Sequence, residues 1–129
     1  MSLDSLVPAF TWDDEAHAET VDAFASIADE ITVKVWGGDW CKDCRSSLPN
    51  FAAAMKAAGV ERDSIEHYPV ERNDDGEKVG PDVETYGIEY IPTIVVERDG
   101  EELVRFVEEE DLPPAIWLAE ELRDGGYVE

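Results

Sequence analysis

The chain has 129 residues, of which 32 are Asp or Glu and 10 are Lys or Arg, so its formal net charge at pH 7 is -22. This length corresponds to a single domain, and a hydrophobic content of 43% is sufficient for its core. The charge argues against nucleic-acid binding, because a phosphate backbone repels an acidic surface. No apolar run approaches the roughly 20 residues that cross a bilayer, and no secretory signal is apparent. We therefore expect one cytoplasmic domain over residues 1–129, with no membrane attachment.

Acidic residues are spread through the whole chain rather than gathered in a tail. Such an excess resembles the proteins of organisms that accumulate salt. At molar salt the Debye length falls to about 3 Å, and the mutual repulsion of carboxylates is screened. We expect a halophilic protein, the alternative being an acidic protein of an ordinary mesophile.

The first half of the chain predicts an irregular segment, two helices and one strand. Residues 1–12 are expected to be irregular, and apolar residues at helical spacing predict a helix over about 13–28. The β-branched segment 31–36 predicts a buried strand. A second helix is expected over about 41–58, ended by Gly59 as its C-terminal cap.

The second half predicts several short elements. In chain order they are a strand over 64–71, a polar loop over 72–81, a short helix over 82–86, a strand over 90–97, a tight turn at 98–100, a strand over 103–107 and a helix over 112–123. This alternation implies an α/β protein with a central mixed β-sheet and helices on both faces.

The only two cysteines, Cys41 and Cys44, lie where the first predicted strand leads into a helix. Unpaired N–H groups and the helix dipole favour an anion there, so Cys41 is placed to react as a thiolate. Lys42 favours the thiolate further, whereas Asp39 and Asp43 oppose it. We expect the helix end to prevail, because distant carboxylates are screened by salt. Cys44 lies on the same helical face and can close a disulfide with Cys41.

Two other roles for the cysteine pair remain open. The pair could form half of a zinc site, or it could be inert in an adaptor. A zinc site needs four ligands, and neither His17 nor His67 lies at a ligand-like spacing from the cysteines. A cytoplasmic Cys-x-x-Cys pair is in general catalytic or metal-binding rather than a structural disulfide.

Four features in order and spacing resemble the thioredoxin family. They are the strand leading to Trp40-Cys41-x-x-Cys44, Pro49 five residues after the second cysteine, the run Tyr86-Gly87-Ile88-x-x-Ile91-Pro92-Thr93, and Asp99-Gly100 after it. The resemblance covers roughly residues 15–125 and implies the thioredoxin fold.

The resemblance implies a thiol–disulfide oxidoreductase that reduces protein disulfides. Cys41 would be the nucleophile and Cys44 the resolving thiol. It also implies a cis peptide bond before Pro92, and a groove in which an extended substrate segment pairs with the Ile91 backbone. The expected motif and substrate-binding residues are Trp40, Lys42, Asp43, Ile91, Pro92 and Thr93.

The resemblance further implies a monomer that needs no metal or organic cofactor besides the Cys41–Cys44 disulfide. Its partners would be disulfide-containing proteins and an electron donor similar to thioredoxin reductase. The alternative function is a non-catalytic adaptor or redox sensor with the same fold.

Three features depart from the family. Thioredoxins carry Cys-Gly-Pro-Cys, whereas this chain has Cys-Lys-Asp-Cys. Val35 occupies the position of the buried aspartate that helps to move the proton in thioredoxin. The possible substitutes are His67, Glu71, Asp39 and Asp43. The connection between Cys44 and Pro92 is also about seven residues longer than in compact thioredoxins, and we place the extra residues in the segment 72–81.

Overall fold

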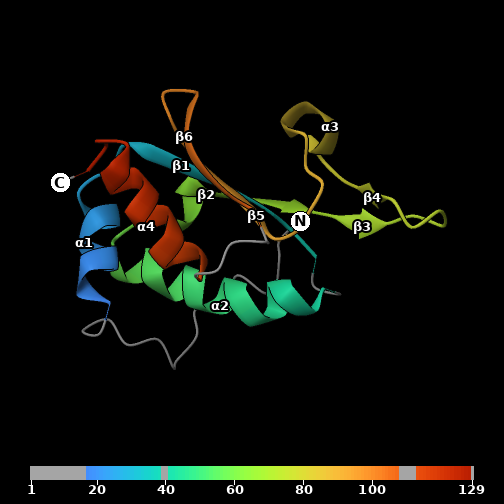
Figure 1. The fold of residues 1–129 in the computed structure, drawn as a ribbon, viewed down its shortest axis with the longest axis horizontal. Helices are drawn as coiled ribbons and strands as arrows, with labels where there is room; N and C mark the ends of the chain where they lie inside the picture. The colour runs from blue at the N-terminus through green and yellow to red at the C-terminus, as the bar shows by residue number, and fades with distance from the viewer. Residues whose placement is uncertain (1–16, 39–40, 108–112, 129) are drawn as a thin grey trace.

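The computed structural model describes residues 17–38, 41–107 and 113–128. Its central sheet contains four strands in the order β2-β1-β5-β6 (Figure 1). β1 and β2 are parallel, whereas β5 is antiparallel to both β1 and β6. The predicted mixed sheet is therefore confirmed. The strands are β1 (Ile31–Gly37), β2 (Ile65–Pro69), β5 (Thr93–Arg98) and β6 (Glu101–Val107).

Three helices, α1 (Ala18–Ala25), α2 (Lys42–Ala57) and α4 (Pro114–Asp124), gather on one side of this sheet (Figure 1). There α4 places Trp117 edge-on against Phe106 of β6, with ring centroids 5.8 Å apart. The short helix α3 (Val83–Tyr86) lies over the opposite face, where the Tyr86 ring contacts Trp36 of β1. Helices on both faces, as in the predicted α/β fold, are confirmed.

The core lies between the sheet and the three long helices. Alternate residues of β1 point into it, because successive side chains of a strand face opposite sides. Its largest fully buried side chains on this side are Phe24, Val33, Val35, Leu48, Phe51, Met55, Ile94, Leu118 and Leu122. No helix within the described ranges is both long and apolar enough to span a membrane.

Helix α2 continues through Pro49 and ends as predicted at Gly59. Gly59 has a left-handed φ of 81°, which favours glycine. Its N–H donates to the carbonyl of Lys56 at 3.2 Å, and the N–H of Val60 donates to that of Met55 at 3.0 Å. This is the Schellman pattern of helix ends.

The predicted end of the first helix was wrong by three residues. α1 ends at Ala25, and turns occupy residues 26–30. The Ser26 hydroxyl donates to the carbonyl of Ala23 at 2.8 Å, which gives the chain a local alternative to the helix. Ile27 and Ala28 remain buried, so the apolar periodicity continues past the last helical turn. The predicted start of this helix lies outside the described residues.

The predicted loop over 72–81 was also wrong, because it contains most of a small hairpin. β3 (Glu71–Arg72) pairs antiparallel with β4 (Lys78–Val79), and the predicted strand over 64–71 is divided between β2 and β3. The Asn73 side-chain oxygen accepts hydrogen bonds from the N–H groups of Asp75 and Glu77, at 3.0 and 2.9 Å. We call residues 71–79 the arm, because they project from the end of the sheet (Figure 1).

The remaining elements lie close to their predicted positions. β5 begins at Thr93 rather than Tyr90, and α4 begins at Pro114. Between β5 and β6, Asp99 and Gly100 have φ angles of 54° and 81°. Two positive φ values in a two-residue connection suit the twist of an antiparallel pair.

A cluster of charged and aromatic side chains covers the sheet face below α3. Lys34 Nζ lies 3.2 Å from a carboxylate oxygen of Glu66 and 3.7 Å from one of Glu97. It donates to the Tyr68 hydroxyl at 3.2 Å, and that hydroxyl donates to Glu66 at 2.8 Å. The Tyr86 hydroxyl donates to Glu97 at 2.7 Å. Burial alone would lower the pKa of Lys34, yet its hydrogen bonds and the Glu97 charge together raise it.

Trp36 connects this cluster to the end of β1. Its fully buried ring stacks on Tyr68 and packs against Tyr86, with centroid distances of 4.5 and 4.8 Å. Its Nε1–H donates to the carbonyl of Pro81 at 2.8 Å. The segment that joins the arm to α3 is thereby attached to the last residues of β1.

We predict that Tyr68→Phe destabilises the protein by about 0.5 kcal/mol at pH 7, because the pair with Glu66 is partly exposed. The Tyr68 hydroxyl is the main reason why the pKa of Glu66 is lowered from 4.5. Ionised Glu66 therefore favours the folded state, and this contribution is lost as the pH falls through the lowered value. Urea unfolding at pH 7 and pH 3.5 should show a smaller difference from wild type at the lower pH. Tyr127→Phe is the control, and a loss that grew on acidification would contradict the prediction.

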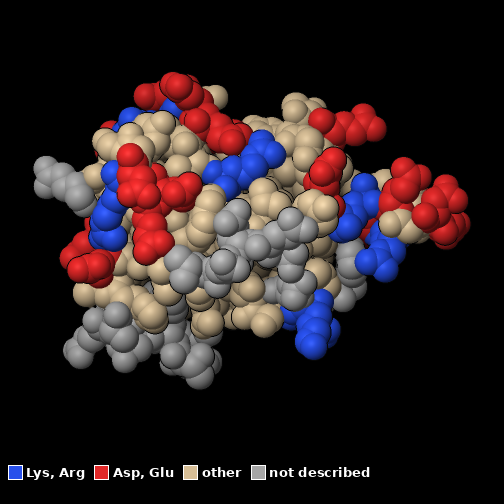
Figure 2. All heavy atoms as spheres, viewed as in Figure 1, with Lys and Arg blue, Asp and Glu red and all other residues tan. Residues whose placement is uncertain are grey.

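We also predict that the protein needs salt. Carboxylates gather near the β5–β6 turn and near the arm on the face in Figure 2, in keeping with the charge of -22. Screening their repulsion should raise the midpoint of thermal unfolding between 0.1 and 2 M potassium chloride. We expect a rise of at least about 5 °C, which corresponds to roughly 1 kcal/mol for a domain of this size. Sucrose at equal osmolarity is the uncharged control, and equal midpoints at the two salt concentrations would refute the prediction.

Candidate active site

Cys41 lies immediately before α2, as the N-cap residue of this helix. Its backbone is extended, with φ -87° and ψ 124°, and its N–H donates to the carbonyl of Gly38 at 2.9 Å. Its own carbonyl accepts the N–H of Arg45 at 3.1 Å, the first bond of the helix. The Cys41 side chain makes no capping hydrogen bond within the described part of the chain. The first-turn N–H groups are thus not used by this side chain and favour an anion nearby.

Cys44 lies one turn further along α2 and has no exposed surface, whereas Cys41 is partly exposed. Both are thiols in the structure. The backbone N–H of Gly38 donates to Cys44 Sγ at 3.5 Å. One sulfur is therefore open to another molecule, and the other is shielded and held by a backbone donor. This is the asymmetry that separate attacking and resolving roles require.

The start of β5 lies at the same end of the sheet as the cysteines. The bond between Ile91 and Pro92 is cis, as the resemblance implied. Thr93 of β5 pairs with Trp36 of β1. The segment before Pro92 and the segment after β1 therefore lie at the same end of the sheet. The Thr93 hydroxyl donates to the carbonyl of Tyr90 at 2.6 Å. Ile91, Pro92 and Thr93 are buried, whereas Tyr90 is 43% exposed.

The other predicted motif residues are placed only in part. Lys42 is the first residue of α2 and is exposed. Asp43 lies in the first turn, but its side chain is outside the described parts. Trp40 and Asp39 also lie outside them. The roles of these four residues stay predictions.

Val35 is fully buried on the sheet face that meets the long helices. Of its possible substitutes as a proton carrier, half-buried His67 pairs with Val35 in the parallel register of β1 and β2. Glu71 is exposed on the arm.

Among the described residues, no group of three or more His, Cys, Asp or Glu side chains is arranged to hold a metal ion.

The sequence did not reveal the role of the Gly38 backbone. Gly37-Gly38 reads as a flexible connection, but both residues make defined hydrogen bonds. The carbonyl of Gly37 accepts the N–H of Val70 at 2.8 Å, and Gly38 contacts both Cys41 and Cys44. The sequence signal that could have indicated this role is the position of Gly37 and Gly38, at the end of a buried strand and shortly before the cysteines.

A family model for thioredoxin matches residues 8–117. The chain belongs to the thioredoxin family. Among solved structures, it is similar to a variant of thioredoxin from Halobacterium salinarum, with 19% identity and a TM-score of 0.52 over 100% of this chain and 97% of that one. It is also similar to a thioredoxin from Nicotiana alata, with 18% identity and a TM-score of 0.50 over 97% of this chain and 96% of that one.

At these identities the likeness to solved structures supports the thioredoxin fold alone. No curated protein matches the chain in sequence. The family and the geometry together identify the end of β1 and the start of α2 as the candidate redox site.

We predict that iodoacetamide at neutral pH labels Cys41 about tenfold faster than an ordinary exposed cysteine, because unpaired N–H groups at the start of a helix attract negative charge. Cys44 should stay unlabelled until the protein is denatured, since it is buried. The matched control is Ser46→Cys in a variant without the native cysteines, because Ser46 is exposed on the same helix. Peptide mass spectrometry gives both rates. If Cys41 is labelled no faster than the control cysteine, the inference that Cys41 is a reactive thiol is wrong.

Proposed function

We propose that this thioredoxin-family protein reduces disulfides of other proteins through a Cys41/Cys44 dithiol–disulfide cycle. The observation that supports this best is the unequal exposure of the two thiols at the start of α2. A partly exposed sulfur can reach a foreign disulfide, and a buried neighbour one turn away is kept for the second step.

In the first step, the Cys41 thiolate attacks one sulfur of the target disulfide. The target S–S bond breaks, a mixed disulfide forms, and the other target sulfur leaves as a thiolate and takes up a proton. Cys44, deprotonated, then attacks Cys41 Sγ and releases the second target thiol. Two electrons pass to the target, and a Cys41–Cys44 disulfide remains.

Gly38 supports the second step, because its N–H donates to Cys44 Sγ and helps to hold this sulfur in place. The cis-proline segment beside the site would hold the target, with an extended segment paired to the Ile91 backbone as in the family. Trp40, Lys42, Asp43, Pro92 and Thr93 complete the proposed site.

The proposal includes a cytoplasmic monomer in which the cysteine pair is the only redox group. A reductase-like donor would return the disulfide to the dithiol. The alternative is a redox sensor or adaptor, and the apolar Val35 favours it, because an acid at this position moves the proton in thioredoxin.

We expect the wild type to catalyse reduction of insulin and of 2-hydroxyethyl disulfide by dithiothreitol at high salt. Cys41→Ser should lose at least about 100-fold in rate, because the attacking sulfur is gone. Cys44→Ser should stop at a mixed disulfide with the target, visible by mass spectrometry. Ser46→Ala on the same helix is the control and should match the wild type.

Absence of turnover by the folded wild type would favour the sensor or adaptor. Equal rates for Cys41→Ser and wild type would exclude the proposed nucleophile. The midpoint potential of the pair then gives the direction of transfer, since a value near the about -270 mV of thioredoxin corresponds to a reductase.

A further inference from the structure

The arm, residues 71–79, is anchored directly beside the candidate active site. The N–H of Val70 donates to the carbonyl of Gly37 at 2.8 Å, where β1 ends. The chain returning from the arm packs tightly on the chain entering it, since a Cβ on Gly80 would lie 2.7 Å from the Pro69 carbonyl oxygen. Trp36 holds Pro81 by a hydrogen bond. The arm and the start of α2 lie at the same end of the molecule (Figure 1).

The arm is a shaped hairpin. Glu71 pairs with Val79, and Arg72 pairs with Lys78. The N–H of Asn73 donates to the carbonyl of Glu77 at 2.9 Å, in addition to the bonds that the Asn73 side chain accepts. A hairpin fixed at both its base and its turn can present side chains in a constant direction.

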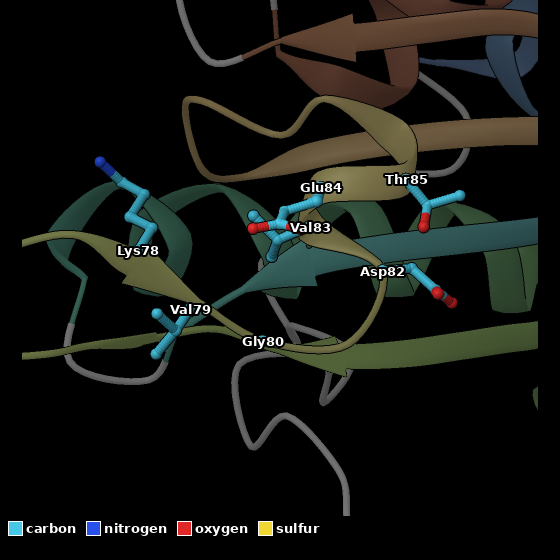
Figure 3. A pocket seen from close by; sticks show the side chains of 7 residues that line it. All are labelled: Lys78, Val79, Gly80, Asp82, Val83, Glu84 and Thr85. Atoms are coloured by element: carbon cyan, nitrogen blue, oxygen red, sulfur yellow. The ribbon is translucent and has the colours of Figure 1, made fainter.

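A cleft of about 270 Å³ lies between the arm and α3. Figure 3 shows Lys78 and Val79 on the β4 side, with Val83 and Glu84 on the α3 side. Its full lining is Lys78, Val79, Gly80, Asp82, Val83, Glu84 and Thr85. The volume is suited to one or two side chains of a partner rather than to a large cofactor.

Apolar exposure also concentrates at this end of the sheet. Among the described residues, the two large hydrophobic side chains with substantial exposure are Val79 and Tyr90, each 43% exposed. Val79 lies on the arm, and Tyr90 precedes the cis-proline segment. Val79 also lines the cleft, so it offers an apolar contact to a partner bound there.

The charges around the cleft define the partner. Residues 71–85 contain six carboxylates and two cations. The lining of the cleft contains two carboxylates, Asp82 and Glu84, and one cation, Lys78. A complementary occupant carries an apolar side chain next to a Lys or Arg.

We propose that the arm and its cleft dock the disulfide-bearing substrate protein, by binding an extended segment in which an apolar residue is followed by a Lys or Arg. This rests on the proposed function, because the segment must also bring its cystine to Cys41. An extended chain covers up to about 3.3 Å per residue, so the docked residues lie several positions from the target cysteine. The arm selects the target, and the cysteine pair carries out the exchange.

The test uses peptides with a cysteine linked to 2-mercaptoethanol by a disulfide, followed by Leu-Lys after four, seven or ten residues. Matched peptides carry Leu-Glu. We expect wild-type kcat/KM to favour the Leu-Lys peptide at least about threefold at one spacing, relative to 2-hydroxyethyl disulfide. Glu84→Lys should remove this preference, and Val79→Ser should lower kcat/KM for both peptides relative to the small disulfide. Glu120→Lys, the same charge change on exposed α4, should keep the preference.

No preference at any of the three spacings, or equal effects of Glu84→Lys and Glu120→Lys, would overturn the proposal. Dimerisation of the protein that is abolished by Val79→Ser would assign the cleft to a second copy and would also overturn it. If the wild type reduces no disulfide at all, the proposed function fails independently. Docking is then tested separately by fluorescence anisotropy, with peptides in which serine replaces the cysteine. Tighter binding of the Leu-Lys peptide than of the Leu-Glu peptide supports docking at the arm, and equal binding of the two peptides refutes it.

Discussion

Two consecutive glycines at the end of β1 hold the site together through their backbone atoms. The Gly37 carbonyl accepts from Val70, the Gly38 carbonyl accepts from Cys41, and the Gly38 N–H donates to Cys44 Sγ. The strand, the helix start, the buried thiol and the base of the arm therefore share one short segment.

The chemistry depends on local contacts, whereas the charge of -22 is a property of the whole surface. The first-turn N–H groups lie at the end of α2 that begins next to Cys41, and salt weakens the repulsion from remote carboxylates. An acidic surface therefore does not by itself exclude the proposed chemistry of Cys41. Val35 bears on a different part of the proposed cycle, because its buried apolar side chain cannot accept a proton. In the proposed cycle, the proton of Cys44 would leave by another group or through solvent.

Local signals predicted much of this fold. The β-branched run of β1, the Gly59 helix end and the Asp99-Gly100 turn each have a backbone reason that is readable from a few residues. The cis bond before Pro92 followed from the family resemblance. What the sequence did not show depends on distant partners or on very short strands. Lys34 needs β2, β5 and α3 to surround it, and the arm's two-residue strands are too polar and short to differ from a loop.

Under the docking proposal, the arm would supply specificity from a surface connection rather than from the cysteine pair. An insertion in a surface connection has a small entropic cost, because loop-closure entropy grows slowly with length. The arm lies outside the packed core, yet its base is fixed by the hydrogen bonds from Trp36 to Pro81 and from Val70 to Gly37. Of these residues, Trp36 and Gly37 belong to the strand end that leads to the cysteines. A change at the arm's tip would then alter the proposed docking, while the Gly38 contacts to Cys41 and Cys44 stay the same.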